Sequence, residues 1–514
     1  MRARPPVSPT MSDLGQTVDP LNAPSSTLVE ADDVVYNPSL DRLREFSREL
    51  ETTTEFGSPA YVSDYRSRSA DRTKNAVDDD FDADDRAYVA AAFEHAREHE
   101  MVCVDRQMGR HPDHSYRCRL FVPKRYARIA LAWAKLFEPV EGDGEPDFLT
   151  IQIPEWEETA IRVLPEEGVT AVLGSDYTGE AKKSFLRLFM FHAKRAGGLG
   201  LHAGSKRVTL QTDAGDLEDV GQLFLGLSAT GKSTLTAHGL WLDDPEEATM
   251  LQDDVCALLP DGSVAGSEGN GLYVKTIGLD EDEQPTLYDA VTHESAVLEN
   301  VDVAPDGTVD FDSDAHTSNG RAVVLRDRLA SAGEEIDLDA VDQIFFITRN
   351  PTMPPIAKLS PAEAAAAFML GESIQTSAGD PTAAGESIRV VGTNPFIVGS
   401  EGEEGNRFRD LIADLGVDCF VLNTGYLGER SKDIGVEETV TILRAVARET
   451  VDWREDDVSG LTVPDAVPGL DVDEFDVTEH VVAYDSALDD LRAERRAYLA
   501  AFDDLDDDIR DAVY

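Results

Sequence analysis

The sequence has few cysteines, few lysines and no long apolar run. Its four cysteines in 514 residues form no C-x-x-C pair, so a zinc knuckle and a disulfide framework are excluded, and free thiols in a reducing compartment are expected. No apolar stretch approaches the roughly 20 residues that cross a membrane, and the N-terminus lacks the apolar core of a signal peptide. We therefore expect a cytoplasmic protein that binds no membrane.

Positive charge is also scarce. The chain has 46 Lys and Arg against 100 Asp and Glu, a net charge of -54, and this excess opposes binding to nucleic acid. A hydrated acidic surface suits a salt-rich cytoplasm, where screening weakens self-repulsion. The alternative is an acidic interaction protein, but 41% hydrophobic residues are enough for a sizeable core. We expect a halophilic, monomeric globular protein.

Lysine is the scarcer of the two cations, with only eleven in the chain. A chain that avoids lysine on its surface should keep it mainly where a cation is needed. Four of the eleven, Lys182, Lys183, Lys232 and Lys275, lie in the motifs described below.

The most informative stretch is residues 226–233, which fit G-x-x-x-x-G-K-[ST]. An apolar run at 222–225 predicts a strand before it, and residues 234–238 predict a helix after it. Backbone N–H groups of such a loop surround a polyphosphate, and the helix start adds a positive dipole end. The predicted nucleotide-binding residues are Gly226, Leu227, Ser228, Ala229, Thr230, Gly231, Lys232, Ser233 and Thr234.

Two carboxylates follow the P-loop helix. Asp253 and Asp254 end a short apolar run, which is the form of a strand that delivers a carboxylate to a metal near the phosphates. The alternative is a surface Asp pair, common in so acidic a chain. The position after the P-loop favours the metal role, with Lys232 on the β and γ phosphates and the Ser233 hydroxyl on Mg²⁺.

Three weaker signals precede the P-loop. Lys182 and Lys183 stand near the start of a predicted helix, where the dipole opposes cations unless an anion is bound nearby. His202 lies between small residues, and a lone histidine is more often structural than a ligand. Arg110 lies in a segment with two histidines, which is equally typical of an anion-binding loop and of a solvated loop.

These motifs occur in the order found in ATP-dependent phosphoenolpyruvate carboxykinase, and the chain resembles a divergent, haloarchaeal-type member of that family. Residues 177–183 resemble its Y-G-G-E-M-K-K, 201–203 its M-H-C, 271–277 its G-C-Y-A-K-T-I and 423–426 its N-T-G-W, while 298–301 are identical to a family segment. The resemblance covers roughly residues 177–439. It implies a two-lobed α/β carboxykinase-like fold, with an N-terminal α/β domain and a P-loop domain built on a mixed sheet.

Composition at the two ends and the resemblance between them predict a division of the chain. We expect a disordered segment at 1–35, a substrate-binding domain at 36–215, a nucleotide- and metal-binding domain at 216–450 and an acidic C-terminal extension at 451–514. Predicted helices at 84–98, 126–137, 361–370, 440–448 and 488–502, and predicted strands at 148–153, 160–164, 169–173, 343–348 and 419–424, populate these segments.

The family's metal ligands fall on residues of this chain. The resemblance implies a second metal, typically Mn²⁺, bound by Lys183, His202 and Asp254, beside Mg²⁺ on Ser233 and the phosphates of ATP. A lysine that binds a metal must be neutral, and a divalent cation beside it favours that form. Asp253 would take part in catalysis.

The family's reaction implies further roles. Oxaloacetate would lose CO₂, and the resulting enolate would attack the γ-phosphate to give phosphoenolpyruvate and ADP, the direction used in gluconeogenesis. Arg110, Tyr177, Lys183 and Arg321 would contact the substrate. Lys232, Lys275 and Arg321 would neutralise charge during phosphoryl transfer.

The nucleotide side departs from the family pattern. Gln284, Arg430, Ser431 and Thr439 would lie near the ribose and adenine, yet Gln284 replaces a family Glu and Ala229 replaces a P-loop glycine. Two alternatives stay open: an HPr-kinase-like enzyme acting on a protein or small-molecule hydroxyl, and a non-catalytic ATP-binding regulator. The upstream lysine and histidine motifs favour the carboxykinase.

Overall fold

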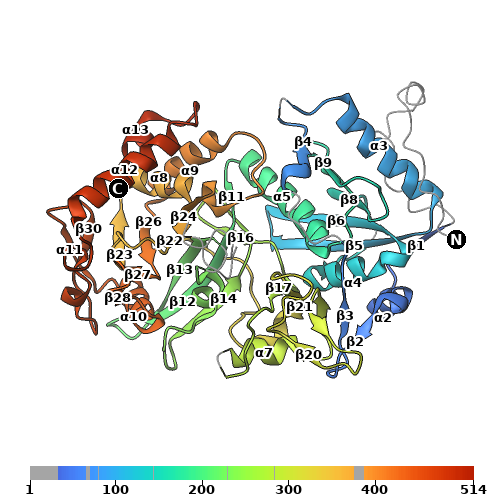
Figure 1. Ribbon diagram of the computed structural model, residues 1–514, viewed down its shortest axis with the longest axis horizontal. Helices are drawn as coiled ribbons and strands as arrows, with labels where there is room; N and C mark the ends of the chain where they lie inside the picture. Colours follow the sequence, from blue (N-terminus) through green and yellow to red (C-terminus); the bar gives the residue numbers. More distant parts are fainter. Residues whose placement is uncertain are drawn as a thin grey trace. The chain divides into compact units, whose positions relative to one another are not determined.

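The computed structural model describes residues 33–64, 70–78, 80–142, 144–227, 230–282, 284–374 and 387–514. The chain forms two compact units (Figure 1). Unit 1 comprises Met1–Phe191 and Ser267–Ala330, and unit 2 comprises His192–Gly266 and Ser331–Tyr514. The chain therefore enters each unit twice.

This division differs from the predicted domain boundaries. The first unit ends at Phe191 instead of residue 215, and Ser267–Ala330 belongs to it although we expected this segment in the P-loop domain. The predicted extension at 451–514 is an integral part of unit 2. Of the predicted disordered segment 1–35, residues 1–32 lie outside the described residues, and a strand begins at Val34. Pairing between distant strands sets these boundaries, and composition carries no signal of it.

Unit 1 contains a mixed sheet in the order β1-β5-β6-β8-β10-β9-β4, with β7 (Glu138–Pro139) paired to β5. The strands are β1 (Val34–Tyr36), β5 (Met101–His111), β6 (His114–Pro123), β8 (Phe148–Ile153), β10 (Val169–Leu173), β9 (Ala160–Leu164) and β4 (Thr73–Asn75). β8, β9 and β10 were predicted with these bounds, and each is rich in apolar residues. β5 and β6 form a hairpin paired from Met101↔Pro123 to His111↔His114, so the predicted loop around Arg110 is largely strand.

Helix α3 (Ala83–Glu98) packs on one face of this sheet through Val89, Phe93 and Ala96. It begins with a capping box between Asp82 and Asp85, which satisfies amides at the helix start. α4 (Ala127–Leu136) is buried over nearly its whole length, and α5 (Thr178–Arg195) follows β10 and begins the lysine motif.

A second sheet completes unit 1, in the order β17-β21-β18-β3-β2. Its strands are β17 (Gly271–Lys275), β21 (Arg321–Leu325), β18 (Val297–Glu299), β3 (Pro59–Tyr61) and β2 (Thr52–Thr53). β18 pairs in parallel with β3, so residues near 60 and near 298 become neighbours. This pairing explains why Ser267–Ala330 belongs with the N-terminal half of the chain.

Unit 2 is built on a mixed sheet, as predicted, in the order β14-β12-β13-β22-β26-β23-β30-β29. The strands are β14 (Glu247–Gln252), β12 (Ala203–Gln211), β13 (Leu217–Gly226), β22 (Gln343–Thr348), β26 (Asp418–Asn423), β23 (Ile356–Leu359), β30 (Thr462–Ala466) and β29 (Asp452–Glu455). β13, β22 and β26 run parallel, so their carboxyl ends share one edge. Ligands of such sheets bind at that edge.

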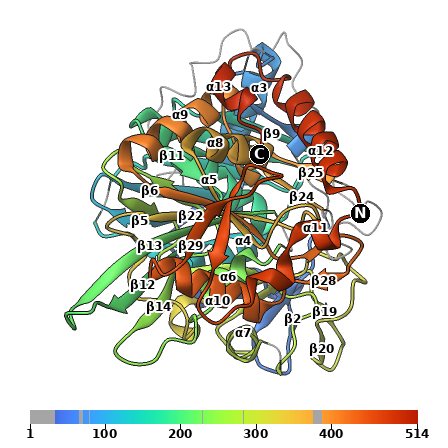
Figure 2. The same cartoon turned by 90° about the vertical axis from the view of Figure 1, so that its left-hand side faces the viewer.

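Helices cover both faces of this sheet (Figure 2). On one side lie α8 (Pro361–Leu370), α9 (Glu401–Leu415), α12 (Tyr484–Leu499) and α13 (Asp507–Asp511), and on the other lie α6 (Lys232–Ala237) and α10 (Val436–Ala447). Along β13, Leu223 and Leu225 join the first core and Phe224 joins the second. This alternation follows from the two-residue period of a strand.

The remaining elements are short. They are α2 (Leu40–Phe46), α7 (Pro285–Val291), α11 (Val477–His480), β11 (Leu199–Leu201), β15 (Cys256–Leu258), β16 (Val264–Gly266), β19 (Asp302–Val303), β20 (Val309–Asp310), β24 (Glu372–Ile374), β25 (Ser387–Arg389), β27 (Tyr426–Leu427) and β28 (Lys432–Asp433). Among the helices of the described ranges, none is both long enough and apolar enough to span a bilayer.

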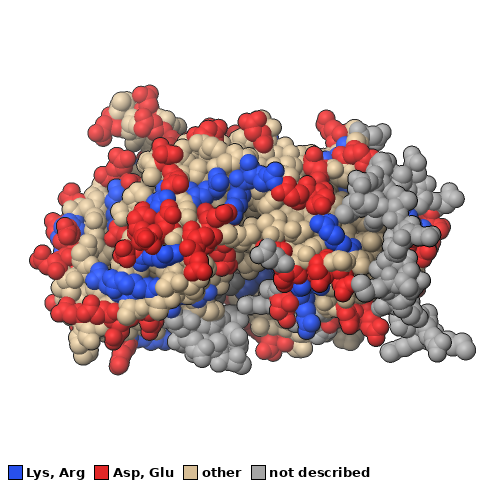
Figure 3. Space-filling view, turned by 90° about the horizontal axis from the view of Figure 1, so that it is seen from above, with Lys and Arg blue, Asp and Glu red and all other residues tan. Residues whose placement is uncertain are grey.

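The pairing state of the cysteines and the distribution of the acidic residues agree with what the composition suggests. All four cysteines are free and buried, which confirms the prediction of unpaired thiols. In the space-filling view, Asp and Glu side chains are scattered over the visible face instead of gathering in one patch (Figure 3).

Candidate active site

The P-loop begins at the carboxyl end of β13, where Gly226 and Gly231 are required for different reasons. A Cβ on Gly226 would approach the Thr230 hydroxyl to 2.6 Å. Gly231 has φ 101°, a left-handed conformation that glycine adopts without strain. The Thr230 hydroxyl donates to the Leu227 carbonyl at 2.8 Å. Ser228 and Ala229 lie outside the described residues.

Lys232 starts α6, and its ammonium nitrogen is buried with no hydrogen-bond acceptor among the described residues. Lys232 Nζ lies 3.9 Å from Asp254 Oδ1, an ion-pair distance without a hydrogen bond. Asp253 Oδ1 is also buried with no described donor. Buried polar atoms without partners are rare in proteins and call for an explanation such as a bound ion. A phosphate on Lys232 and a cation on Asp253 would satisfy both atoms.

His202 lies between β11 and β12, and both of its ring nitrogens are engaged. Nδ1 lies 2.6 Å from the Thr393 carbonyl, and Nε2 lies 3.1 Å from Asp254 Oδ1. A carbonyl oxygen only accepts, so Nδ1 carries a proton, and Nε2 faces the carboxylate either as an N–H donor or as a ligand of a cation held between the two groups. A second hydrogen bond of this kind orients histidines that bind metals.

The His202–Asp254 pair fits a divalent cation. Two ligands each about 2.1 Å from one ion at right angles are about 3 Å apart, close to the observed 3.1 Å. Within the described ranges, no group of three or more His, Cys, Asp or Glu side chains is assembled for a metal. Lys183 as a third ligand remains a prediction from the sequence.

In unit 1, the predicted lysine motif forms the first turns of α5. Lys183 Nζ lies 3.2 Å from Glu180 Oε1 and 5.5 Å from the centre of the Tyr177 ring. Lys182 is buried and lies 3.1 Å from Glu268 Oε2. The unusual pair of lysines near a helix start is thus offset by one carboxylate each.

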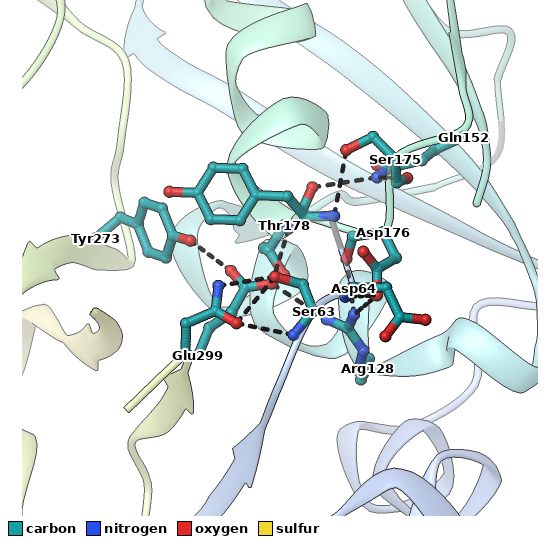
Figure 4. Close-up of polar contacts among 11 residues, drawn as sticks. Ser63, Asp64, Arg128, Gln152, Ser175, Asp176, Thr178, Tyr273 and Glu299 are labelled. Atoms are coloured by element: carbon teal, nitrogen blue, oxygen red, sulfur yellow. Dashed lines mark hydrogen bonds and ion pairs between the residues drawn. The ribbon is translucent and has the colours of Figure 1, made fainter. Parts of the chain in front are cut away.

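A buried ionic network positions the start of α5 (Figure 4). Arg128 of α4 donates to Asp176 Oδ2 at 2.7 Å and to Glu299 Oε1 at 3.1 Å. Glu299 also accepts from the Thr178 amide at 3.0 Å and from the Tyr273 hydroxyl at 2.5 Å. Burial, and next the Glu299 charge, raise the pKa of Tyr273 well above its usual value, so this phenol remains a hydrogen-bond donor.

Lys275 and Arg321 are direct cross-strand partners on β17 and β21. Like charges directly opposite each other destabilise a sheet, but Arg321 is also the direct partner of Glu299 on β18, a carboxylate that offsets the repulsion. Arg321 donates to Asn319 Oδ1 at 2.9 Å, and Asn319 donates to the Tyr177 hydroxyl at 3.3 Å. The Arg321 Nε is buried without an acceptor in the described part of the chain. Three predicted substrate or phosphate contacts are therefore assembled within unit 1.

The other predicted residues are placed less distinctively. Arg110 makes two hydrogen bonds to the Glu138 carboxylate, at 2.8 and 3.0 Å, and one to the Gly269 carbonyl. Gln284 is the N-cap of α7 in unit 1. Arg430 lies over the Tyr426 ring, and the buried Thr439 hydroxyl donates to the Gly435 carbonyl.

Ser431 donates its hydroxyl to the Leu427 carbonyl at 3.1 Å and lies 3.0 Å from His480 Nδ1. Thr234 follows Lys232 and Ser233 in the first turn of α6. The roles predicted for these residues remain predictions.

Three residues that support predicted groups, each within its own unit, were not assigned roles from the sequence. The Thr424 hydroxyl donates to the Thr230 carbonyl at 2.8 Å, although its N-T-G segment was noted. Lys206, fully buried on β12, donates to the Leu235 and His238 carbonyls at the end of α6, at 2.5 and 2.6 Å. Glu299 lies in the segment identical to the family's, which was the one signal available for it.

Known proteins resemble this chain over most of its length. A family model described as phosphoenolpyruvate carboxykinase matches residues 34–473. A protein of Aeropyrum pernix named phosphoenolpyruvate carboxykinase (ATP) is 36% identical over 489 residues, covering 94% of this chain and 97% of its own. A protein of the same name from Bradyrhizobium diazoefficiens is 29% identical over 429 residues, covering 75% of each chain.

Proposed function

Because the chain belongs to the phosphoenolpyruvate carboxykinase family, we propose that it converts oxaloacetate and ATP to phosphoenolpyruvate, ADP and CO₂. The observation that carries the proposal is the Lys232 ammonium, buried at the P-loop without a described hydrogen-bond acceptor. A γ-phosphate oxygen is the acceptor that this position suits. The reaction is that of a carboxy-lyase, used in gluconeogenesis and carried out by a monomer in the cytoplasm.

Two divalent cations would take part. Mn²⁺ would be held by His202 and Asp254, which lie 3.1 Å apart, together with Lys183 as a neutral amine. Mg²⁺ would be held by the Ser233 hydroxyl and the phosphates, beside Asp253. The bound cations would supply charge neutralisation for the phosphates and for the enolate oxygen.

The chain's own cations would bind and orient the reactants. Tyr177 and Arg321, linked through Asn319, would hold the carboxylates of oxaloacetate, with Arg110 as a further contact. The C–C bond to the departing CO₂ breaks, and its electron pair forms the enolate. The enolate oxygen bonds to the γ-phosphorus, whose bond to the ADP oxygen breaks. Lys232, Lys275 and Arg321 would neutralise the charge of that transfer.

The decisive assay supplies purified protein with ATP, Mg²⁺, Mn²⁺ and oxaloacetate in concentrated KCl. We expect phosphoenolpyruvate and ADP in equal amounts. Formation of ADP only when a protein or small-molecule hydroxyl acceptor is added would favour an HPr-kinase-like activity instead. Binding of ATP without any turnover would favour the third alternative, a non-catalytic ATP-binding regulator.

Substitution of the metal-binding histidine separates catalysis from nucleotide binding. We expect His202→Ala to abolish phosphoenolpyruvate formation and to leave ATP affinity nearly unchanged, because the P-loop is intact. Activity would be followed by phosphoenolpyruvate release and affinity by calorimetry. Full turnover in His202→Ala would exclude the Mn²⁺ assignment.

We also propose that the acidic surface adapts the chain to concentrated salt. With a net charge of -54, self-repulsion should weaken the folded state when screening is removed. We expect the thermal midpoint to rise steadily as KCl is raised toward and beyond about 1 M. Equal stability in dilute buffer would count against the halophilic character.

A further inference from the structure

Arg349 is the first residue beyond the carboxyl end of β22, beside the P-loop. In the parallel register, Gly226 of β13 lies opposite Ile347 of β22, so the two strands end at the same level. The Thr424 amide donates to the Thr348 carbonyl at 2.9 Å, and the Thr424 hydroxyl donates to the Thr230 carbonyl at 2.8 Å. Two hydrogen bonds of Thr424 thus connect the residue before Arg349 to the P-loop.

The strand period assigns Arg349 to the face of the sheet that carries the P-loop helix. Phe345 and Ile347 belong to the core beneath α6 and α10, whereas Ile344 and Phe346 belong to the opposite core. Position 349 continues the first series. Its Cβ lies 3.1 Å from the position that a Cβ on Gly425 would occupy, next to Thr424.

Among the described arginines of unit 2, three have a buried Nε without an acceptor, and Arg349 differs from the other two in its remaining partners. Its Nε is buried without an acceptor in the described ranges, and the structure records no hydrogen bond or ion pair for the rest of its guanidinium. Arg492 and Arg510 also have a buried Nε without an acceptor, but each donates through another nitrogen to a carbonyl. Burial lowers the pKa of Arg349, with no carboxylate to oppose the shift.

The backbone around Arg349 is held firmly. The Asn423 side-chain amide donates to the carbonyls of Asn350 and Met353, at 2.9 and 2.8 Å. The Gly428 amide donates to the Pro351 carbonyl at 3.0 Å. The loop after β22 is therefore tied to the loop after β26, and the base of the Arg349 side chain is fixed instead of following a flexible surface turn.

We propose that Arg349 binds the phosphate chain of the nucleotide held by the P-loop. The chain has 100 acidic residues, yet no carboxylate is recorded as a partner of this half-buried cation. A guanidinium presents a planar fork of donors that matches phosphate oxygens, and the β22 edge brings that fork next to the loop whose backbone surrounds them. The inference rests on the proposed function only in requiring a bound nucleotide.

The test measures binding by titration calorimetry of the full chain, with Mg²⁺ and two separate probes, ATP and inorganic tripolyphosphate. We expect Arg349→Gln to lower the affinity for both probes by about 10- to 100-fold, the range expected for loss of a charge-assisted hydrogen bond. Arg349→Lys should recover part of the loss, because it restores the charge but not the fork.

Arg448→Gln is the matched control. Arg448 follows α10, whose Val446 carbonyl accepts from Gln343 at the amino end of β22, so it lies at the sheet edge opposite the P-loop. It pairs with Glu246 at 2.6 Å. We expect both affinities of Arg448→Gln to equal those of the wild type.

Three outcomes would overturn the proposal. Unchanged affinity of Arg349→Gln for both probes would show that Arg349 does not contact the phosphates. A lower affinity for ATP with an unchanged affinity for tripolyphosphate would show that Arg349 contacts the nucleoside instead of the phosphates. Equal weakening in Arg349→Gln and Arg349→Lys, with a lowered thermal midpoint in both, would make the residue structural. None of these measurements needs oxaloacetate, so failure of the carboxykinase assay would leave this test intact.

Discussion

The buried network of unit 1 and the P-loop edge of unit 2 use charge in opposite ways. In unit 1, the Arg128 guanidinium is paired with two carboxylates, Asp176 and Glu299, inside the protein. In unit 2, Lys232 has no hydrogen-bond acceptor in the described residues, and neither does the Nε of Arg349. Paired buried charges hold a structure together, whereas unpaired ones are retained at a cost that a ligand can offset.

This difference separates two kinds of residue that both have charged-group atoms inside the protein. The Arg128 network orients Tyr273 and the start of α5, so its removal should lower the free energy of unfolding. Lys232 makes no hydrogen bond within the described residues, so its substitution should lower activity and leave stability nearly unchanged. Substitutions in the two regions test this contrast directly.

The largest effect is expected from Lys232→Met. Removing the ammonium from the developing phosphate charge should lower the rate of phosphoenolpyruvate formation by about 10³-fold or more. The thermal midpoint should stay the same or rise, because an apolar side chain of similar length replaces a buried ammonium that makes no hydrogen bond within the described residues. Steady-state assays and thermal melting of the same preparation check both halves.

Lys358→Met serves as its control, since Lys358 is partly exposed and pairs with Asp418 at 2.8 Å. It should keep full activity. A large drop in the melting temperature of Lys232→Met would contradict the contrast, because it would assign that lysine a structural role.

The next largest effect is expected from Arg128→Met, which leaves Asp176 and Glu299 as buried carboxylates without their cation. We expect the free energy of unfolding to fall by about 3–5 kcal/mol, measured by urea-induced unfolding. Arg125→Met, which removes an exposed arginine 4.0 Å from Glu155, should change it by less than about 0.5 kcal/mol. Equal effects of the two substitutions would show that the network adds no stability.

A smaller effect is expected from the pH dependence that Lys206 confers. Burial lowers the pKa of Lys206 to about 7, while in the unfolded chain it stays near 10.5. Between these values the unfolded state binds more protons, so stability should rise with pH over that window. From pH 7 to 9 this single group contributes about 2 kcal/mol.

The measurement compares wild type and Lys206→Met at several pH values. Wild type should gain stability relative to Lys206→Met as the pH rises from 7 toward 10, and the difference should be flat below 7. A constant difference throughout would mean that the folded-state pKa of Lys206 is close to its unfolded value.

The parallel strands were predictable from the sequence because both of their faces are buried. Residues 343–348 and 418–423 are nearly continuous apolar runs, which is typical of strands covered on both sides. Helix α8 was predictable from its Ser360 cap and its apolar residues. These signals are local, so a single sequence carries them.

Helix α9 was not predicted from the sequence, because the contacts that require its glycines are with residues far away in the chain. Its first residues include Gly402 and Gly405, which weaken any helix prediction. A Cβ on Gly402 would lie 2.1 Å from Asp504 Oδ1, and one on Gly405 would lie 2.5 Å from Met369 Sδ. Both glycines are needed for close packing against residues about 100 and 36 positions away, and neither partner can be identified from the helix itself.

The candidate site shows the same limit. The P-loop, Asp253, Asp254 and His202 were predicted from motifs, but the Thr393 carbonyl that orients His202 lies 191 residues along the chain. A backbone carbonyl has no residue-type signature. The long-range hydrogen bonds that prepare a site for its ligand therefore became visible only with the fold.

The interleaved course of the chain has a consequence for its synthesis. β13 and β22 are neighbours in the sheet of unit 2, yet the ribosome makes Ser267–Ala330, which belongs to unit 1, between them. β13 emerges more than 100 residues before its parallel neighbour and must wait with that edge uncovered. During translation this strand therefore exposes an unpaired edge of the kind that invites wrong pairing and that chaperones protect.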